Sequence, residues 1–162
     1  MNQLRRELEQ MYDECSQQLF TCALAITRRK ELAEDAMQNA FCKLITLKER
    51  PQTLKLYVFR SVRNAAIDIL RKEKRMNAFS EDYIYPTRST PRDHSETSEF
   101  QQRVVQAMQQ LSDDERETVV HHLYADLTFR EISELREISI NTVMSWYRRG
   151  IEKLRIELEE VQ

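Results

Sequence analysis

Glycine and proline are scarce in this sequence, which has one Gly and three Pro among 162 residues. A chain rich in antiparallel strands needs glycine for tight hairpin turns, so this composition excludes most β architectures. No run of about 18 apolar residues occurs, and we therefore expect no membrane insertion. The first ten residues are charged and lack the apolar core of a secretion signal. We expect an all-α, cytoplasmic protein with one domain or two small ones.

Side chains that bind metals are also few and widely spaced. They comprise three cysteines and three histidines: Cys15, Cys22, Cys42, His94, His121 and His122. Their spacing matches no metal site, so we interpret the cysteines as buried free thiols and the two adjacent histidines as surface or partly packed side chains. The sequence has no glycine-rich phosphate loop and no Ser–His–Asp set. We expect no metal, no cofactor and no enzymatic activity.

The net charge of −2 hides an uneven distribution. Residues 1–75 carry a net charge of +5, whereas residues 76–100 and 101–162 carry −3 and −4. Ten Lys and Arg face only three Asp and Glu within residues 43–75. A concentrated basic segment of this kind is typical of a surface that binds nucleic acid.

Residues 111–154 have the apolar spacing of helices, with a break in phase around residues 136–139. The pattern predicts two short helices joined by a tight turn, after a third helix from about Ser112 to Tyr124. Ser112 and Glu115 can form a capping box for the first of these helices, and Ser139 can cap the last. The last helix then turns a polar, basic face outward: Asn141, Thr142, Met144, Ser145, Arg148 and Arg149. Such a face suits the recognition helix of a helix-turn-helix in a DNA major groove, although a plain helical hairpin fits the spacing too.

The order of residues in this stretch resembles region 4 of bacterial sigma factors. The segments that carry the resemblance are LS followed by RETV, then LTFREIS, then ISINTVMS. It implies that the outward face, together with Arg130 and Ser139, contacts the minus-thirty-five promoter element. Glu137 stands where the family has glycine, so it either adopts a strained left-handed backbone or the turn has another shape. Met144 and Trp146 replace frequent cations, which predicts a weaker hold on phosphates and more contact with thymine methyl groups. Trp146 itself either faces the DNA or packs inward.

The N-terminal half also has helical spacing. Residues 4–28 predict one or two helices, and three cations at 28–30 mark a turn. Residues 31–47 predict an amphipathic helix with Leu32, Ala36, Met37, Ala40, Phe41, Leu44 and Ile45 on its inner face. The opposite face carries Glu34, Asp35, Gln38 and Asn39. These four residues either form an ordinary solvated surface or bind a basic partner.

A further helix is predicted over residues 56–75, after a loop that contains Pro51. Its outer face and its end carry Arg60, Arg63, Asn64, Arg71, Lys72, Lys74 and Arg75. So many cations exceed what a helix C-terminus needs, and a basic track with an aromatic platform is what captures single-stranded nucleic acid. Tyr57 is the candidate platform, although aromatic residues at such spacing usually belong to a core.

The segments AEDAMQNAF and YVFRSVRNAAIDILRK, at residues 33–41 and 57–72, resemble sigma factor region 2. The resemblance implies that Glu34, Asp35, Gln38 and Asn39 bind the clamp coiled coil of the RNA polymerase largest subunit. It also implies that Tyr57 and the basic track take the melted minus-ten strand. Asn39 stands where the family usually has an acid, and Tyr57 where it has tryptophan.

Taken together, the two resemblances suggest an alternative sigma factor of the extracytoplasmic-function type. The expected domains are a region 2-like domain at 1–75, a flexible linker at 76–100 rich in Ser, Thr, Pro and acids, and a region 4-like domain at 101–162. The implied partners are core RNA polymerase, through its clamp coiled coil and flap, and promoter DNA, with an anti-sigma factor as a further candidate.

Two other functions fit part of the sequence. A stand-alone regulator would bind DNA as a dimer through residues 112–155 and would recognise a palindromic operator. A helical adaptor that binds only protein would show no salt-dependent affinity for DNA, and the cations at residues 71–75 argue against it.

Overall fold

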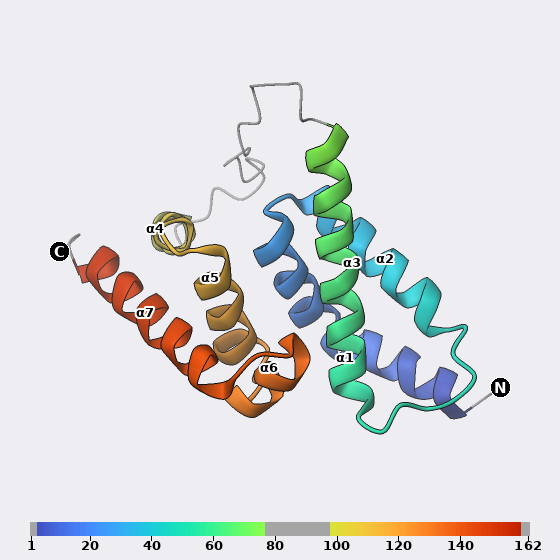
Figure 1. The fold of residues 1–162 in the computed structure, drawn as a ribbon. Helices are drawn as coiled ribbons and strands as arrows, with labels where there is room; N and C mark the ends of the chain where they lie inside the picture. Colours follow the sequence, from blue (N-terminus) through green and yellow to red (C-terminus); the bar gives the residue numbers. More distant parts are fainter. Residues whose placement is uncertain (1–2, 77–97, 160–162) are drawn as a thin grey trace. The chain divides into compact units, whose positions relative to one another are not determined.

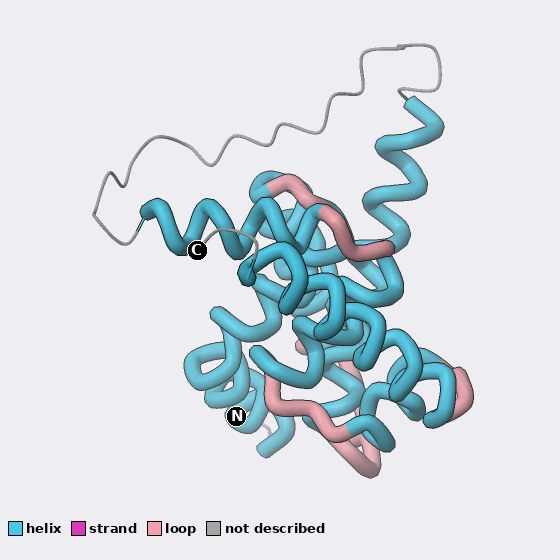
Figure 2. The backbone as a smooth tube through the Cα atoms, turned by 90° about the vertical axis from the view of Figure 1, so that its left-hand side faces the viewer, coloured by secondary structure: helices cyan, strands magenta, loops and turns pink. Residues whose placement is uncertain are grey.

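The computed structural model describes residues 3–76 and 98–159, and over these residues it consists of helices joined by loops (Figure 1). No strand occurs in the described ranges (Figure 2), so the predicted all-α class is confirmed. Nearly all of the predicted linker, at residues 77–97, lies outside them. The elements in chain order are α1 (Gln3–Thr27), α2 (Lys30–Leu44), α3 (Leu54–Met76), α4 (Ser98–Gln109), α5 (Asp113–Val119), the π-helix η1 (Val120–Tyr124), α6 (Phe129–Arg136) and α7 (Ile140–Glu159).

The first of two compact units contains α1, α2 and α3, and each of these helices packs against the other two. The 25 residues of α1 form one unbroken helix because they contain no Gly or Pro to interrupt it. On α2 the side chains of Ala33, Ala36 and Ala40 are buried, and their small size lets the neighbouring backbones approach closely. The centre of the unit is filled by larger side chains: Leu8, Leu19, Leu44, Val58, Phe59 and Val62.

The predicted turn at residues 28–30 joins α1 to α2. Arg28 has a φ of 59°, a left-handed conformation that ends the first helix. Its backbone N–H still donates to the carbonyl of Leu24 at 2.8 Å. The Arg29 guanidinium then reaches Glu73 near the end of α3, with Nη1 2.7 Å from Oε1. The start of α2 is therefore held against the end of α3 by an ion pair as well as by apolar packing.

The second unit contains α4, α5, η1, α7 and most of α6. The predicted capping box is confirmed: Ser112 Oγ accepts from the backbone N–H of Glu115 at 3.2 Å, and Glu115 Oε1 accepts from that of Ser112 at 3.0 Å. Helix α7 packs along α5 at Gly150, the only glycine of the chain. A Cβ at Gly150 would lie 2.8 Å from Cγ2 of Val119, so any larger residue would force its neighbours to shift.

Three expectations about single residues are wrong. Ile45 was expected in the core but is 51% exposed, because α2 ends at Leu44 and Ile45 lies in the following turn. Cys42 was expected to be a buried thiol but is exposed, whereas Cys22 is buried and Cys15 half-buried. His121 was expected at or near the surface but is 1% exposed, because η1 changes the helical register at that point.

Two observations concern membrane-spanning helices and metal sites. No helix within residues 3–76 and 98–159 is long and apolar enough to cross a membrane. Across the same part of the chain, no group of three or more His, Cys, Asp or Glu side chains is arranged to hold a metal ion.

Candidate functional site

The outer face of α2 carries the four predicted polymerase-binding residues. Glu34, Asp35, Gln38 and Asn39 are all exposed, directly opposite the buried alanines of the same helix. Lys30 Nζ lies 4.0 Å from Glu34 Oε1, with both side chains largely exposed, and such a pair contributes little in water. The structure thus brings two acids and two amides together on one solvent-facing surface, here called the α2 polar face.

Helix α3 positions the predicted basic track. Asn64 is exposed, whereas Arg60 and Arg63 are half-buried rather than fully outward. At the end of the helix the remaining predicted cations are all exposed: Arg71, Lys72, Lys74 and Arg75. Glu73, the only acid in that cluster, is directed to Arg29 by their ion pair. The cluster is left with an excess of positive charge, which suits a run of phosphates.

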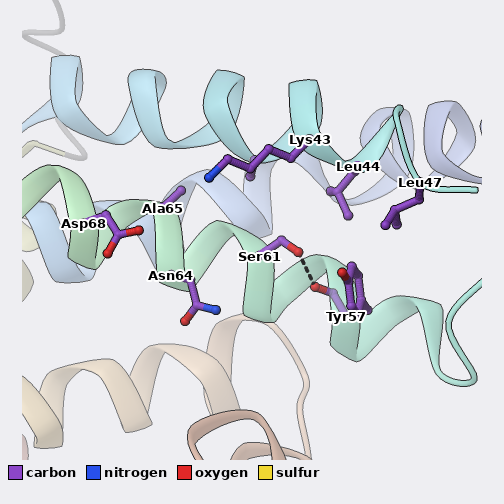
Figure 3. A pocket seen from close by; sticks show the side chains of 9 residues that line it. Lys43, Leu44, Leu47, Tyr57, Ser61, Asn64, Ala65 and Asp68 are labelled. Atoms are coloured by element: carbon purple, nitrogen blue, oxygen red, sulfur yellow. Dashed lines mark hydrogen bonds between the residues drawn. The ribbon is translucent and has the colours of Figure 1, made fainter.

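A pocket lies between the end of α2 and the outer face of α3 (Figure 3). Its volume is about 290 Å³, close to the lower end of the ~300–1,000 Å³ range of small-molecule sites. Tyr57 is 37% exposed and forms part of the wall, so it is not a core residue. The Ser61 hydroxyl donates to the Tyr57 carbonyl at 2.8 Å, which holds Ser61 on the same wall (Figure 3). The remaining lining residues are Ala40, Lys43, Leu44, Leu47, Asn64, Ala65 and Asp68.

Lys43 and Ser61 were not predicted as site residues, yet both line this pocket. Lys43 belongs to the last turn of α2, and Figure 3 shows its side chain extending along the space between α2 and α3. The available signal was its place at the start of the basic segment 43–75. The packing of α2 on α3, which a periodic pattern does not give, is what makes it part of the pocket.

The predicted helix-turn-helix is formed by α6 and α7. Ser139 precedes α7, and its Oγ accepts from the backbone N–H of Asn141 at 3.1 Å, so the predicted cap is confirmed. Glu137 has a φ of 56°. Of the two alternatives for this turn, it therefore adopts the left-handed backbone at the position where the family has glycine. The backbone N–H of Ile138 donates to the Ser133 carbonyl at 3.1 Å and closes the turn.

Some of the predicted DNA-binding side chains of this motif are exposed and others are half-buried. Val143, on the inner side of α7, is completely buried, and Tyr147 is half-buried. Thr142 and Ser145 are half-buried as well. The other predicted contacts are exposed: Arg130 near the start of α6, and Ser139, Asn141, Met144, Arg148 and Arg149 in and before α7. Trp146 is half-buried, between the two alternatives left open by the sequence.

An aromatic cluster holds the motif together. The His122 ring stacks on Phe129 with centroids 4.2 Å apart, and Tyr147 meets both rings edge-on at 4.8 and 5.1 Å. His122 Nδ1 lies 2.8 Å from the carbonyl oxygen of Leu127. Because a carbonyl only accepts, this hydrogen bond places a proton on Nδ1. His122 of η1 thus contacts both Phe129, at the start of α6, and Tyr147, on the inner side of α7.

Glu115 links the start of α5 to α7. Lys153 Nζ lies 2.7 Å from its Oε1, the same oxygen that accepts from Ser112. Burial by itself raises the pKa of Glu115, but the hydrogen bonds from Lys153 and Ser112 and the charge of Lys153 outweigh it. The pKa of Glu115 is therefore below its ordinary value, and the carboxylate stays ionised at neutral pH.

A helix-turn-helix with an exposed polar face, on the same chain as a helix that ends in exposed cations, is typical of nucleic-acid-binding proteins. Two family models match the chain: Sigma-70 region 2 over residues 11–76, and Sigma-70, region 4 over residues 101–154. The chain belongs to the sigma-70 family and is a sigma factor of the extracytoplasmic-function type.

Similar proteins agree with this family, and a solved structure has a similar fold. RNA polymerase sigma factor CarQ from Myxococcus xanthus is 34% identical over 142 residues, covering 85% of this chain and 80% of the relative. ECF RNA polymerase sigma factor SigM from Bacillus subtilis (strain 168) is 25% identical over 151 residues, covering 91% and 93%. The sigma factor RpoE of Bartonella quintana, crystallised with the anti-sigma factor NepR, has a similar fold, with a TM-score of 0.77, 20% identity and coverage of 97% of this chain and 99% of that one.

Membership of this family gives the biochemical function. The protein is an alternative sigma factor that binds core RNA polymerase and directs promoter recognition and transcription initiation. Sigma factors are not a class of enzymes.

Proposed function

We propose that the chain divides the work of a sigma factor between two domains, at residues 1–75 and 101–162, with residues 76–100 connecting them. The first domain would hold the polymerase and the melted minus-ten strand, and the second would read the minus-thirty-five duplex and contact the polymerase flap. The protein would work in the cytoplasm without a catalytic centre of its own, because RNA synthesis belongs to the polymerase.

The α2 polar face is the proposed docking surface for the clamp coiled coil of the polymerase largest subunit. Glu34 and Asp35 would attract cations of the partner helices, and Gln38 and Asn39 would form hydrogen bonds at their side. Exposed charges of this kind contribute to orientation and association rate more than to affinity. The exposure of all four residues supports the assignment.

The pocket between α2 and α3 is the proposed receptor for an unstacked base of the minus-ten strand. The Tyr57 ring offers a stacking surface, and Lys43, Ser61, Asn64 and Asp68 offer hydrogen-bonding groups among the apolar side chains of the wall. Phosphates on either side would lie on Arg60 and Arg63 and on the cations at residues 71–75. The position of the pocket on the helix that bears the basic track is the single observation that carries this proposal.

An anti-sigma factor is a further proposed partner. The sigma factor RpoE of Bartonella quintana was crystallised with the anti-sigma factor NepR. We extend this type of partner to the present chain because its α2 polar face is exposed and strongly polar. Such a protein would compete with the polymerase for that face.

The division of labour is tested with Asp35→Lys and Arg148→Ala in the full chain. Size-exclusion chromatography with core RNA polymerase measures docking, and run-off transcription with promoter binding measures recognition. Asp35→Lys should weaken docking about tenfold or more, because it places a like charge against a basic partner. Arg148→Ala should leave docking intact and lower promoter affinity. Glu14→Lys, the same kind of charge reversal at an exposed position of α1, is the matched control and should behave as wild type.

The base pocket is tested separately with Tyr57→Ala and Tyr57→Phe. Holoenzyme binding to a fork with an exposed minus-ten strand should fall several-fold for Tyr57→Ala and stay near wild type for Tyr57→Phe, which keeps the ring. Equal loss of docking in Asp35→Lys and Arg148→Ala would refute the proposed division. A protein that ignores polymerase yet shifts duplex DNA as a dimer would be the stand-alone regulator instead.

A further inference from the structure

The first two turns of α7 carry no cation. Apart from the half-buried rings of Trp146 and Tyr147, the exposed or half-exposed side chains from Ile140 to Tyr147 are amide, hydroxyl, thioether and alkyl groups, and the first guanidinium is that of Arg148. Met144 is 47% exposed and Ile140 is 39% exposed, although both are apolar. The part of a recognition helix that reaches base edges is its N-terminal part, so this choice of side chains bears directly on base selection.

The helix geometry sets which side chains share the outward face. Asn141, Ser145 and Arg148 are spaced i, i+4 and i+7, so they form one stripe, and Met144 lies beside it. Buried Val143 and Gly150 lie on the opposite side and fix the rotation of the helix against its own domain. At 1.5 Å per residue, Arg148 is about 10 Å further along the axis than Asn141. That distance corresponds to about three base pairs.

The N-terminal end of this stripe is held in place. The Ser139 cap bonds to the backbone N–H of Asn141, so the first turn is anchored where the side chain of Asn141 leaves the helix. Arg149 Nε lies 3.4 Å from the Ser145 carbonyl, which draws that cation toward the flank of the stripe rather than its centre. The reading end is thus a fixed, uncharged surface, and the positive charge begins only behind it.

Each of these groups has a preferred base edge in the major groove. An asparagine amide pairs bidentately with adenine N6 and N7, and an apolar side chain packs against the thymine methyl group. Guanine is read most often by arginine or lysine, and neither occurs in the first two turns. A serine hydroxyl group can form a hydrogen bond with either an A·T or a G·C base pair, so it adds little discrimination.

We propose that α7 reads A·T base pairs in the minus-thirty-five duplex, with Asn141 on an adenine and Met144 against a thymine 5-methyl group, while Arg148 and Arg149 hold phosphates. This inference rests on the proposed role of residues 101–162 in duplex recognition. It makes Asn141 and Met144 the specificity-determining residues of the second domain.

The experiment uses holoenzyme assembled from the full chain and core polymerase of the same host. Promoter duplexes with a randomised upstream element are selected by binding and then sequenced. The expected element contains adjacent A·T pairs at its centre. Each thymine of the selected element is then replaced by deoxyuridine, which lacks only the 5-methyl group, and each adenine by 7-deazaadenine, which lacks only N7.

At one thymine, the deoxyuridine replacement should lower the affinity of wild-type holoenzyme about fourfold, the value of one buried methyl group. Met144→Ala should bind the thymine and uridine duplexes equally, and Met144→Leu should restore the difference. Asn141→Ala should likewise lose the response to 7-deazaadenine. Ile156→Ala removes an apolar side chain of similar exposure, 45%, at the other end of α7, and it should keep the full response to both analogues.

The outcomes separate this inference from the proposed function. A selected element centred on G·C pairs, or an unchanged thymine response in Met144→Ala, would overturn the reading by Met144 and Asn141 while leaving duplex recognition by this domain in place. Failure of the holoenzyme to select any upstream element would instead overturn the role of residues 101–162 on which the inference rests.

Discussion

Replacing Gly150 by alanine sets two well-characterised effects against each other. In a helix interior, Gly→Ala normally stabilises a protein by about 1 kcal/mol, because alanine restricts the unfolded backbone and favours the helix. Here the new Cβ would lie 2.8 Å from Cγ2 of Val119 and 3.3 Å from Cδ2 of Leu111, both on buried side chains. Val119 is β-branched and cannot easily rotate away.

The cost of this overlap is expected to exceed the gain. Overpacking a core costs about 1–3 kcal/mol, and a contact as short as 2.8 Å against a stiff side chain belongs to the upper part of that range. Gly150→Ala should therefore lower the free energy of unfolding of the second unit by about 1–2 kcal/mol. Urea unfolding followed by the fluorescence of Trp146 measures this directly, because Trp146 is the only tryptophan and lies in α7.

A double-mutant comparison shows whether the overlap is the cause. In a Val119→Ala background the nearest obstructing atom is absent, so Gly150→Ala should there be neutral or stabilising by up to about 1 kcal/mol. If Gly150→Ala instead raised stability equally in both backgrounds, helix propensity alone would decide at this position. The close packing of α7 on α5 would then have no energetic weight.

Two further predictions concern the turn between α6 and α7 and the contact between α5 and α7. Glu137→Gly should raise the free energy of unfolding by about 1 kcal/mol, because glycine adopts the left-handed backbone without the ~1–2 kcal/mol penalty, less its entropy cost. A lower stability in the same urea assay would contradict this. Glu115→Gln should lower the free energy of unfolding by about 1 kcal/mol at pH 7. Because the folded pKa of Glu115 is lowered, its stabilisation is present above the ordinary value of 4.5 and is lost as the pH falls through the folded value. Unfolding of both proteins from pH 7 to pH 3 should show this difference vanish; a constant difference would rule the ion pair out as its source.

Most of the fold follows from local patterns. The helices, the turn at residues 28–30 and the caps at Ser112 and Ser139 depend on residues close in sequence, and the structure has all of them. The exposure of the α2 polar face was equally predictable, since four polar residues at helical spacing face away from a run of alanines. The residue at the turn, Glu137, left two conformations open, and only the backbone angle selects one.

The failures have a common physical origin. Ile45 follows the apolar period of α2, but the helix ends one residue earlier, and periodicity does not give that end. His121 lies in η1, where a π-turn shifts the register, so a 3.6-residue period assigns its face wrongly. The pocket requires α2 and α3 to pack side by side, which brings Lys43 beside Ser61 and Tyr57. The pocket depends on the packing of two helices, which the periodicity of either one does not give.

Helix α7 performs two tasks along one rigid rod of 20 residues. Its first turns carry the surface proposed to meet DNA, and its later part rests on α5 at Gly150. The two regions are separated by about 13 Å, so a tilt of about 5° at the glycine contact displaces Asn141 by about 1 Å. The contact at Gly150 is therefore the point about which α7 would tilt. On the proposed role of α7, substitutions at this contact would change how the protein is positioned on a promoter without altering any side chain of the surface that faces the bases.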